Sequence, residues 1–381
     1  MLIGAALLLA APFARAQAPA PLDAGAGGPP FPITYPSPVV TPYAANNTVT
    51  AFLFLPPGPG PYPAMVVLHE WNGWSGAQRL CHIIARAGVA ALLVTEPYSL
   101  SRRTADSPGI LSGDPPQMRD ALQQAVLDAR RGLDVLSRRP DIDPDRLGVA
   151  GISLGGILGG LVAGMDPRVK VVLTADAGAE FARGFWNGLL TFRFQREIRR
   201  RGYTFETFQA AMAPVEASRW LHGFNPDSAL MFNGRYDLVV RPEQAEVLAR
   251  ALGGTRIVWA NTGHYGLALS ASSAAPVIVR FLRARFFGEG LPFRPPDTLP
   301  SQTIKSGLLL GGQEGVSPAL AYQLLDFDRA GRYSLDGQLT LHGLSAALSA
   351  RLGPTSAIGI QFPLGHGTAK PHPYVLFSLT L

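Results

Sequence analysis

The chain has 381 residues, of which 47% are apolar and only 16% are charged. This composition excludes a disordered chain and suits one large domain with an appendage, or two domains. The net charge of +6 comes without a clustered basic face or a base-reading motif, so we expect no nucleic-acid partner.

The N-terminal residues have the pattern of a secretory signal peptide. Residues 2–11 form an apolar stretch that is too short to span a bilayer, and Ala14-Arg15-Ala16 supplies a small-residue cleavage pattern. We therefore expect residues 1–16 to be a signal peptide and the protein to be secreted or periplasmic. Residues 17–47 are rich in Pro, Ala and Gly and predict a flexible leader.

From residue 48 to residue 290, short apolar runs alternate with amphipathic stretches. The runs AMVVLH, VAALLVTE and RLGVAG are typical of buried parallel strands, and the stretches between them have helical periodicity. The alternation predicts an α/β domain with a doubly wound, mostly parallel sheet and right-handed crossovers. Residues 179–224 interrupt the alternation as a helical insertion that is placed to cap a cleft.

The C-terminal part has a different texture. Residues 291–303 predict a linker, and residues 304–381 contain six short alternating runs that predict a β-strand-rich appendage. Val375, Phe377, Leu379 and Leu381 alternate as strands of outer-membrane barrels do, but six strands are fewer than the usual minimum of about eight. We therefore favour a soluble β module or an oligomerisation patch, with membrane association through the appendage as the alternative. The sequence leaves the oligomeric state open.

The motif Gly151-Ile152-Ser153-Leu154-Gly155 lies between a predicted strand and a predicted helix. In such a strand–turn–helix, small flanking residues permit a sharp turn that raises the serine hydroxyl above the carboxyl edge of the sheet. Ser153 is therefore the candidate nucleophile.

A serine hydroxyl needs a base, and two residues later in the chain follow the expected order of nucleophile, acid and histidine. Asp237 ends the run SALMFNGRYD, and His264 ends the run TRIVWANTGH. Both are expected at the carboxyl edge, where His264 would move the proton and Asp237 would orient the imidazole. Asp176 also ends a predicted strand and is the alternative acid.

An oxyanion hole is the second requirement. We expect one donor to be the backbone N–H of Leu154 and the other to come from the loop where Trp71 follows Glu70. These groups need no metal and no organic cofactor, so none is expected.

Five stretches together resemble the dienelactone hydrolase family of α/β hydrolases. They are VVLHEWNG, ALLVTEPY, the G-x-S-x-G motif, NGRYDLVV and GHYGLAL, and the similarity covers about residues 50 to 287. The resemblance implies that Glu70 contacts the nucleophile and that the N–H of Trp71 completes the oxyanion hole. The founding enzymes use cysteine where this chain has Ser153, and serine-containing relatives look like esterases.

The resulting expectation is a serine hydrolase that cleaves a carboxylic ester, or a lactone or thioester, of a small molecule through an acyl-enzyme. Trp74, Tyr98 and Arg102 are candidate pocket residues, with core packing as the alternative for Trp74 and a solvated loop for the other two. The acyl and alcohol groups of the substrate stay open.

Two other functions remain. One is a peptidase of the prolyl-oligopeptidase type, which usually carries a large N-terminal propeller that the short leader cannot form. The other is a non-catalytic hydrolase-like protein whose appendage binds a partner in the cell envelope.

Overall fold

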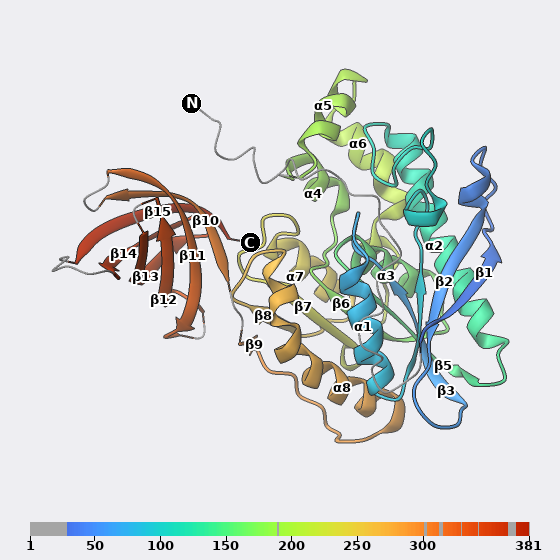
Figure 1. Ribbon diagram of the computed structural model, residues 1–381. Coiled ribbons are helices and arrows are strands. Elements are labelled where there is room, and N and C mark those ends of the chain that lie inside the picture. Colours follow the sequence, from blue (N-terminus) through green and yellow to red (C-terminus); the bar gives the residue numbers. More distant parts are fainter. Residues whose placement is uncertain are drawn as a thin grey trace.

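The computed structural model describes residues 29–188, 190–300, 303–311, 315–328, 330–341, 343–364 and 371–380. The predicted signal peptide lies outside these residues. Within them, the chain forms an α/β unit around a nine-stranded sheet and a separate six-stranded closed barrel (Figure 1). The predicted fold class, an α/β sheet with an all-β appendage, is confirmed.

The sheet of the α/β unit has the strand order β1-β2-β4-β3-β5-β6-β7-β8-β9. Strands β1, β2 and β4 pair antiparallel, and all other neighbours pair parallel. The central strands read as continuous apolar runs because both faces of the sheet are covered. The strand bounds are β1 Phe31–Pro36, β2 Thr48–Phe54, β3 Tyr62–Leu68, β4 Ala90–Val94, β5 Ile142–Ile152, β6 Val169–Ala175, β7 Ala229–Gly234, β8 Ile257–Ala260 and β9 Thr298–Leu299.

Strand β1 and the 3₁₀ turn η1 (Ala44–Asn47) fall inside the segment that the sequence predicts to be a flexible leader. The structure differs there because β1 is an edge strand that pairs with β2 and buries only one side chain, Tyr35. An edge strand tolerates proline and does not need an apolar run, so its sequence resembles a loop.

Helices cover both faces of the sheet. Side chains of α1 (Ser75–Arg86) and α8 (Ala271–Phe287) pack in one core cluster. Side chains of α2 (Pro115–Ser137), α3 (Leu154–Met165) and α7 (Pro242–Ala251) pack in the other. Two short 3₁₀ turns, η2 and η6, lie at Leu100–Arg102 and Gly266–Ser270.

Residues 266–287 are long and apolar enough by composition to cross a membrane. In the structure, however, Val277, Ile278, Phe281 and Leu282 are buried in the core cluster shared with α1. This segment is therefore a core helix of the α/β unit.

The predicted helical insertion lies between β6 and β7. Its aromatic side chains pack on one another: the ring of Phe185 lies 5.6 to 5.9 Å from the rings of Phe181, Phe194 and Phe208. Within the described residues, its helical elements are α4 Phe181–Asn187, α5 Phe192–Arg200, α6 Phe205–Met212, η3 Ala213–Val215, η4 Ala217–Arg219 and η5 Pro226–Ser228.

The appendage is an antiparallel barrel that lies beside the α/β unit (Figure 1). Each strand pairs with the next, and β15 closes the barrel on β10. The strands are β10 Ile304–Gly311, β11 Val316–Asp326, β12 Tyr333–Thr340, β13 Gly343–Gly353, β14 Ser356–Pro363 and β15 His372–Thr380.

Candidate active site

Ser153 lies on a strained turn between β5 and α3. Its φ of 53° and ψ of −117° place a non-glycine residue in a rarely occupied region. The turn is held by a 2.8 Å hydrogen bond from the Ser153 N–H to the carbonyl of Ala175, at the end of β6. The strain is therefore balanced by the sheet, as a raised nucleophile requires.

The two flanking glycines of the motif are required by close backbone approaches. A Cβ on Gly151 would lie 2.2 Å from the carbonyl oxygen of Gly155. A Cβ on Gly155 would lie 2.3 Å from the carbonyl oxygen of Leu68, at the end of β3. The spacing of the motif thus follows from how tightly α3 packs against β3 and β5.

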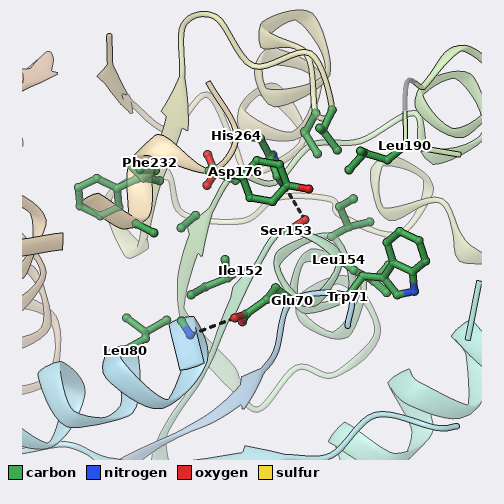
Figure 2. Close-up of a pocket in the computed structure, with 18 of the residues that line it drawn as sticks. Glu70, Trp71, Leu80, Ile152, Ser153, Leu154, Asp176, Leu190, Phe232 and His264 are labelled. Atoms are coloured by element: carbon green, nitrogen blue, oxygen red, sulfur yellow. Dashed lines mark hydrogen bonds between the residues drawn. The ribbon is translucent and has the colours of Figure 1, made fainter. Parts of the chain in front are cut away.

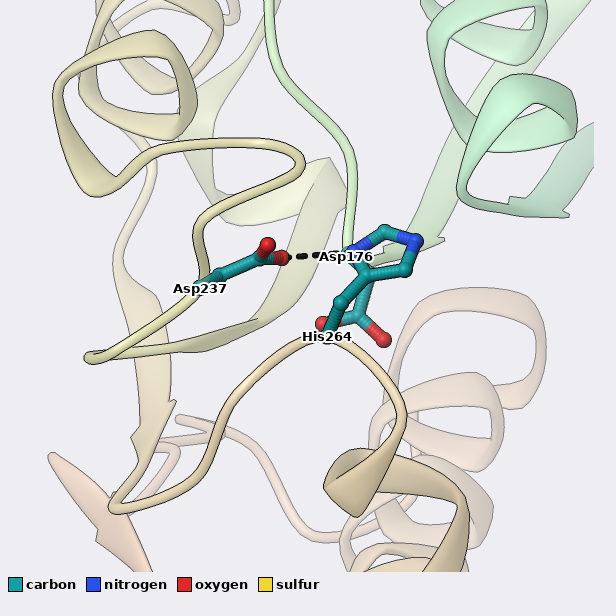
Figure 3. A group of neighbouring side chains, drawn as sticks. All are labelled: Asp176, Asp237 and His264. Atoms are coloured by element: carbon teal, nitrogen blue, oxygen red, sulfur yellow. Dashed lines mark hydrogen bonds and ion pairs between the residues drawn. The ribbon is translucent and has the colours of Figure 1, made fainter. Parts of the chain in front are cut away.

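The structure brings Ser153, His264 and Asp237 into one hydrogen-bonded series. Ser153 Oγ lies 2.9 Å from His264 Nε2, and His264 Nδ1 lies 2.7 Å from Asp237 Oδ2 (Figures 2 and 3). The other carboxylate oxygen of Asp237 accepts hydrogen bonds from the N–H groups of Val239 and Val240. The carboxylate is thereby fixed in orientation, and it in turn fixes the imidazole.

The pKa of His264 is set by its burial and by the charge of Asp237. Burial by itself lowers the pKa of His264, but the charge and the hydrogen bond of Asp237 outweigh it and raise that pKa to about 9. The Asp237 side chain is fully buried, so its interaction with the imidazole is little screened by solvent.

Asp176, the alternative acid, lies beside the pair, with a carboxylate oxygen within 4.8 Å of the ligand atoms of Asp237 and His264 (Figure 3). Burial raises the pKa of the Asp176 carboxyl well above its usual range, with a further contribution from the charge of Asp237, while His264 acts in the opposite direction. Of the two acids, Asp237 is the one that hydrogen-bonds the imidazole.

Asp176, Asp237 and His264 are also the residues of this site that a cation would use. Their ligand atoms lie within 4.8 Å of one another. The imidazole, however, is hydrogen-bonded at both nitrogens, to Ser153 and to Asp237. This arrangement suits proton transfer at Ser153, since a metal ligand must leave one ring nitrogen free for the ion.

Ser153 and His264 open into a cavity of about 350 Å³. Its floor comes from the strand ends and α3, and its roof from the insertion. The apolar walls include Leu80, Leu111, Ile157, Phe181, Phe185, Leu190, Val240 and Leu267. The cavity therefore suits an apolar group placed next to the Ser153 hydroxyl.

Leu154 and Trp71, the predicted oxyanion-hole residues, both line this cavity beside Ser153 (Figure 2). Leu154 is the first residue of α3, so its N–H has no partner within the helix. The indole of Trp71 packs against Phe194 of the insertion, with ring centres 6.0 Å apart. Trp71 thus connects the loop after β3 to the roof.

Glu70 also lines the cavity, but its carboxylate is hydrogen-bonded to the start of α1. Its carboxylate accepts from the N–H groups of Gly76 and Ala77, in the first turn of α1. A Cβ on Gly73 or Gly76 would collide with this carboxylate. The structure therefore shows Glu70 as a cap of α1, with the loop that contains Gly73 and Gly76 packed against its carboxylate. The predicted contact of Glu70 with the nucleophile stays a prediction.

The structure does not bring Trp74, Tyr98 and Arg102 to the cavity. Trp74 packs edge-on against Phe52 and His69. Tyr98 packs against Tyr43, and Arg102 is fully buried.

Arg102 lies behind the site, where it has structural partners. Its guanidinium is 2.8 Å from the carboxylate of Asp128 and donates to the backbone carbonyls of Asn46 and Thr95. A buried charge of this kind needs such a complete set of partners. It fastens the loop after β4 to η1 and α2.

Sequence reasoning missed the residues of the roof. Phe181, Phe185 and Leu190 come from the insertion and line the cavity. The sequence predicts the insertion as a cap, but the signal for these individual residues is only the density of aromatic residues between 181 and 208, which equally fits packing within the insertion. Only the path of the chain between β6 and β7 places them over Ser153.

Two family models match this part of the chain. Residues 49–176 match the dienelactone hydrolase family, and residues 118–264 match the prolyl oligopeptidase family. The first range includes Glu70 and Ser153, and the second includes Ser153, Asp237 and His264.

The α/β unit belongs to the dienelactone hydrolase-like α/β hydrolases. The protein YtaP of Bacillus subtilis (strain 168) is 39% identical over 46 residues, or 12% of this chain and 15% of that protein. The chain thus matches only a small part of this curated relative.

Solved structures share the fold of this dienelactone hydrolase-like unit. An acetyl xylan esterase from Paenibacillus sp. R4 is 22% identical with a TM-score of 0.51, covering 62% of this chain and 80% of its own. The Pyrococcus horikoshii acylaminoacyl peptidase is 12% identical with a TM-score of 0.51, and the match covers 70% of this chain and 43% of the peptidase. A 2,6-dihydroxy-pseudo-oxynicotine hydrolase is 15% identical with a TM-score of 0.50, covering 71% of each chain. These similarities concern the fold.

Proposed function

We propose that the protein is a serine hydrolase that cleaves a carboxylic ester through an acyl-enzyme intermediate. The observation that carries the proposal is the hydrogen-bonded series Ser153–His264–Asp237, with distances of 2.9 and 2.7 Å, at the floor of an apolar cavity. Membership of a hydrolase family supports it.

In this proposal His264 Nε2 takes the proton of Ser153 Oγ as that oxygen attacks the carbonyl carbon of the ester. The N–H groups of Leu154 and Trp71 stabilise the oxyanion of the tetrahedral intermediate. The intermediate collapses, the C–O bond to the alcohol breaks, and His264 gives its proton to the leaving alkoxide. A water molecule then releases the acid from Ser153 by the same steps.

The cavity indicates the substrate class. Leu80, Ile157, Phe185 and Leu267 present apolar surface within reach of Ser153, which favours an ester with an apolar acyl or alcohol group over a sugar or a highly charged molecule. Lactones and thioesters present the same carbonyl chemistry and are included in the proposal.

The proposal is tested with Ser153→Ala, and with Ser75→Ala as the matched control because Ser75 lines the same cavity and is exposed. We expect Ser153→Ala to lose ester hydrolysis by a factor on the order of 10⁶ in kcat, and to lose labelling by a fluorophosphonate. Ser75→Ala should retain both. Unlabelled wild-type protein without ester hydrolysis would instead favour the non-catalytic envelope-binding function.

A peptidase of the prolyl-oligopeptidase type is the second candidate, because residues 118–264 match that family. The same acyl-enzyme would then form from an amide. Comparing kcat/KM for a series of nitrophenyl esters with that for aminoacyl and prolyl anilides separates the two functions. A preference for the anilides would replace the esterase proposal.

We also propose that the protein is exported, on the basis of the signal-peptide pattern in residues 1–16. Mass spectrometry of the protein from periplasmic and medium fractions should show a mature N-terminus at Gln17. An intact N-terminus in the cytoplasmic fraction alone would contradict this.

A further inference from the structure

The six-stranded barrel has polar groups inside, where most small barrels have apolar ones. Lys305 and Asp336 form a buried ion pair at 2.8 Å. The hydroxyl of Ser349 donates to the same Asp336 carboxylate at 2.6 Å and lies 2.5 Å from the hydroxyl of Tyr374. Ionised and hydroxyl side chains therefore share the interior of the barrel with a small apolar cluster that includes Leu309 and Leu376.

The outer face of the same strands is apolar. On the described barrel strands, every Asp, Glu, Lys and Arg is paired across the strands with a buried residue and therefore faces the interior. Lys305, for example, is paired with Ala321, and Arg351 with Ala357. The large apolar side chains that are at least one-third exposed include Leu308, Val316, Leu320, Tyr322, Leu324, Tyr333, Leu339, Leu344, Leu348, Leu352, Ile358, Ile360, Phe362, Phe377 and Leu379.

These outward side chains form a belt around the barrel, because the strand pairing places them next to one another. The register pairs along the belt are Leu320 with Leu339, Leu339 with Leu344, Leu348 with Ile360, Ile358 with Val375, and Phe377 with Leu308. The ladder is closed, so the belt has no edge. All six strands contribute to it.

Exposing an apolar belt of this extent to water is energetically unfavourable. Soluble monomers rarely expose contiguous apolar patches larger than a few hundred Å². Here the alternation is inverted on all six strands, with an ion pair buried inside the barrel and large apolar side chains exposed outside it. Something covers the belt.

We propose that the hydrocarbon of a lipid bilayer covers the belt, so that the barrel anchors the enzyme in a membrane. Apolar-out, polar-in alternation on closed antiparallel strands is the arrangement that a bilayer imposes, since every backbone group is paired within the barrel. The strands are 8 to 11 residues long, close to the about 9–11 residues with which a tilted strand crosses a bilayer.

A second copy of the chain fits the belt less well than lipid does. A two-fold interface uses one patch of the surface, and it would leave the strands on the opposite side of the barrel exposed. The belt also lacks the charged groups that form the polar rim of a protein interface. Charge-free surface on every strand is complementary to hydrocarbon.

Six strands are fewer than the about eight of the smallest outer-membrane barrels, which is why the sequence favours a soluble module or an oligomerisation patch. The consequence of the small strand number is a narrow interior, where Lys305, Asp336, Ser349 and Tyr374 are buried and linked by hydrogen bonds. The barrel therefore serves as an anchor and not as a pore. In this proposal the α/β unit, which lies beside the barrel (Figure 1), stays outside the bilayer.

The test uses the full chain purified in a mild detergent and reconstituted with phosphatidylcholine vesicles. We expect the wild-type protein to float with the vesicles in a density gradient, and to stay with them through high salt and an alkaline carbonate wash. Protein that is monomeric and unbound without detergent overturns the proposal. Release of the protein from the vesicles by salt also overturns the proposal, as does a discrete oligomer that does not bind vesicles.

Variants separate the belt from other surfaces. Leu320→Glu combined with Leu348→Glu places two charges on the belt and should reduce the floated fraction about tenfold or more. Leu320→Ala with Leu348→Ala keeps the belt apolar and should still float. Val40→Glu is the control, because Val40 is a highly exposed apolar residue on the α/β unit.

Circular dichroism of each variant in detergent shows whether the barrel still folds. A glutamate variant with an intact β spectrum that floats like the wild type contradicts the proposal. Because flotation is independent of turnover, an inactive wild-type protein that floats would refute the proposed esterase function and leave the anchor in place.

Discussion

At the scale of single residues, the site depends on how His264 is held. Its Nδ1 faces the buried carboxylate of Asp237, and its Nε2 faces Ser153. Two backbone N–H groups fix the carboxylate from the other side. The imidazole tautomer that leaves Nε2 free to accept the serine proton is therefore set by the loop after β7.

The first prediction separates the two acids. Asp237→Asn should lower kcat by a factor on the order of 10⁴, because the amide no longer fixes the imidazole tautomer or stabilises the imidazolium. Asp176→Asn should cost less than about tenfold, because the imidazole Nδ1 is hydrogen-bonded to Asp237 and keeps that partner in this variant. Kinetics with one nitrophenyl ester measure both. The reverse order would make Asp176 the orienting acid.

The second prediction concerns pH. His264 acts as a base only when neutral, and its pKa is raised to about 9 by Asp237 against the effect of burial. We expect kcat/KM to rise with pH and to reach half of its plateau near pH 9. In Asp237→Asn the residual activity should rise at lower pH, because the lowering of the His264 pKa by burial is then opposed only by the charge of Asp176. A wild-type midpoint at or below the ordinary histidine value would contradict the assignment.

The same group contributes to stability with a defined sign. Because the folded-state pKa of His264 is raised, the protonated imidazole stabilises the fold fully below its unfolded value of about 6.5. This contribution is lost as the pH rises through about 9. Activity and this part of stability therefore change in opposite directions over the same pH range.

At the scale of elements, the insertion supplies the roof, and Glu216 fastens it. The carboxylate of Glu216 accepts hydrogen bonds from the N–H groups of Glu180 and Phe181, at the start of α4, at 3.0 and 2.9 Å. These two donors have no partners within the helix. α4 carries Phe181 and Phe185 over the cavity.

The third prediction follows from this cap. Glu216→Ala should lower stability by about 1 kcal/mol, a typical value for a lost helix cap. If the proposed function holds, it should raise KM for apolar esters several-fold with little change in kcat, since the variant alters the roof of the cavity and leaves Ser153, His264 and Asp237 unchanged. Glu246→Ala, which removes an exposed carboxylate on α7, is the control. An equal effect in both variants would argue against a specific role of the cap.

At the scale of the whole molecule, the barrel touches the α/β unit beside the acid of the site. Tyr236, the neighbour of Asp237, donates to the carbonyl of Ala330 at 2.5 Å. The guanidinium of Arg351 lies 3.6 Å from the centre of the Tyr236 ring. Asp326 accepts from Asn261, on the loop that leads to His264. The barrel is thus docked on the loops that carry the acid and the base.

The fourth prediction tests this docking. Tyr236→Phe removes one hydrogen bond, worth about 1 kcal/mol, and should increase proteolysis of the 291–303 linker about fivefold. The kcat should stay within about threefold, because the carboxylate of Asp237 keeps its own N–H donors. Tyr62→Phe, which removes a hydroxyl bonded to the Gly58 carbonyl far from the barrel, is the control. A large loss of kcat would mean that the barrel positions the acid directly.

The sequence by itself determined the features that arise from local chemistry. Alternating buried runs and helical stretches require a covered parallel sheet, and the glycines around Ser153 require a sharp turn. The carboxyl edge of that sheet then brings Ser153, Asp237 and His264 together, although more than 100 residues separate the first from the last. These positions follow from strand direction, which a local pattern reveals.

Only the tertiary structure decided what depends on distant packing. Arg102 was ambiguous in sequence, and only the approach of Asp128 and Asn46 made it a buried structural charge. The same holds for β1, for the roof residues Phe181 and Phe185, and for the barrel. Alternation along one strand is identical for an open sheet and for a closed barrel. Whether the polar or the apolar face lies inside is decided only when β15 closes on β10.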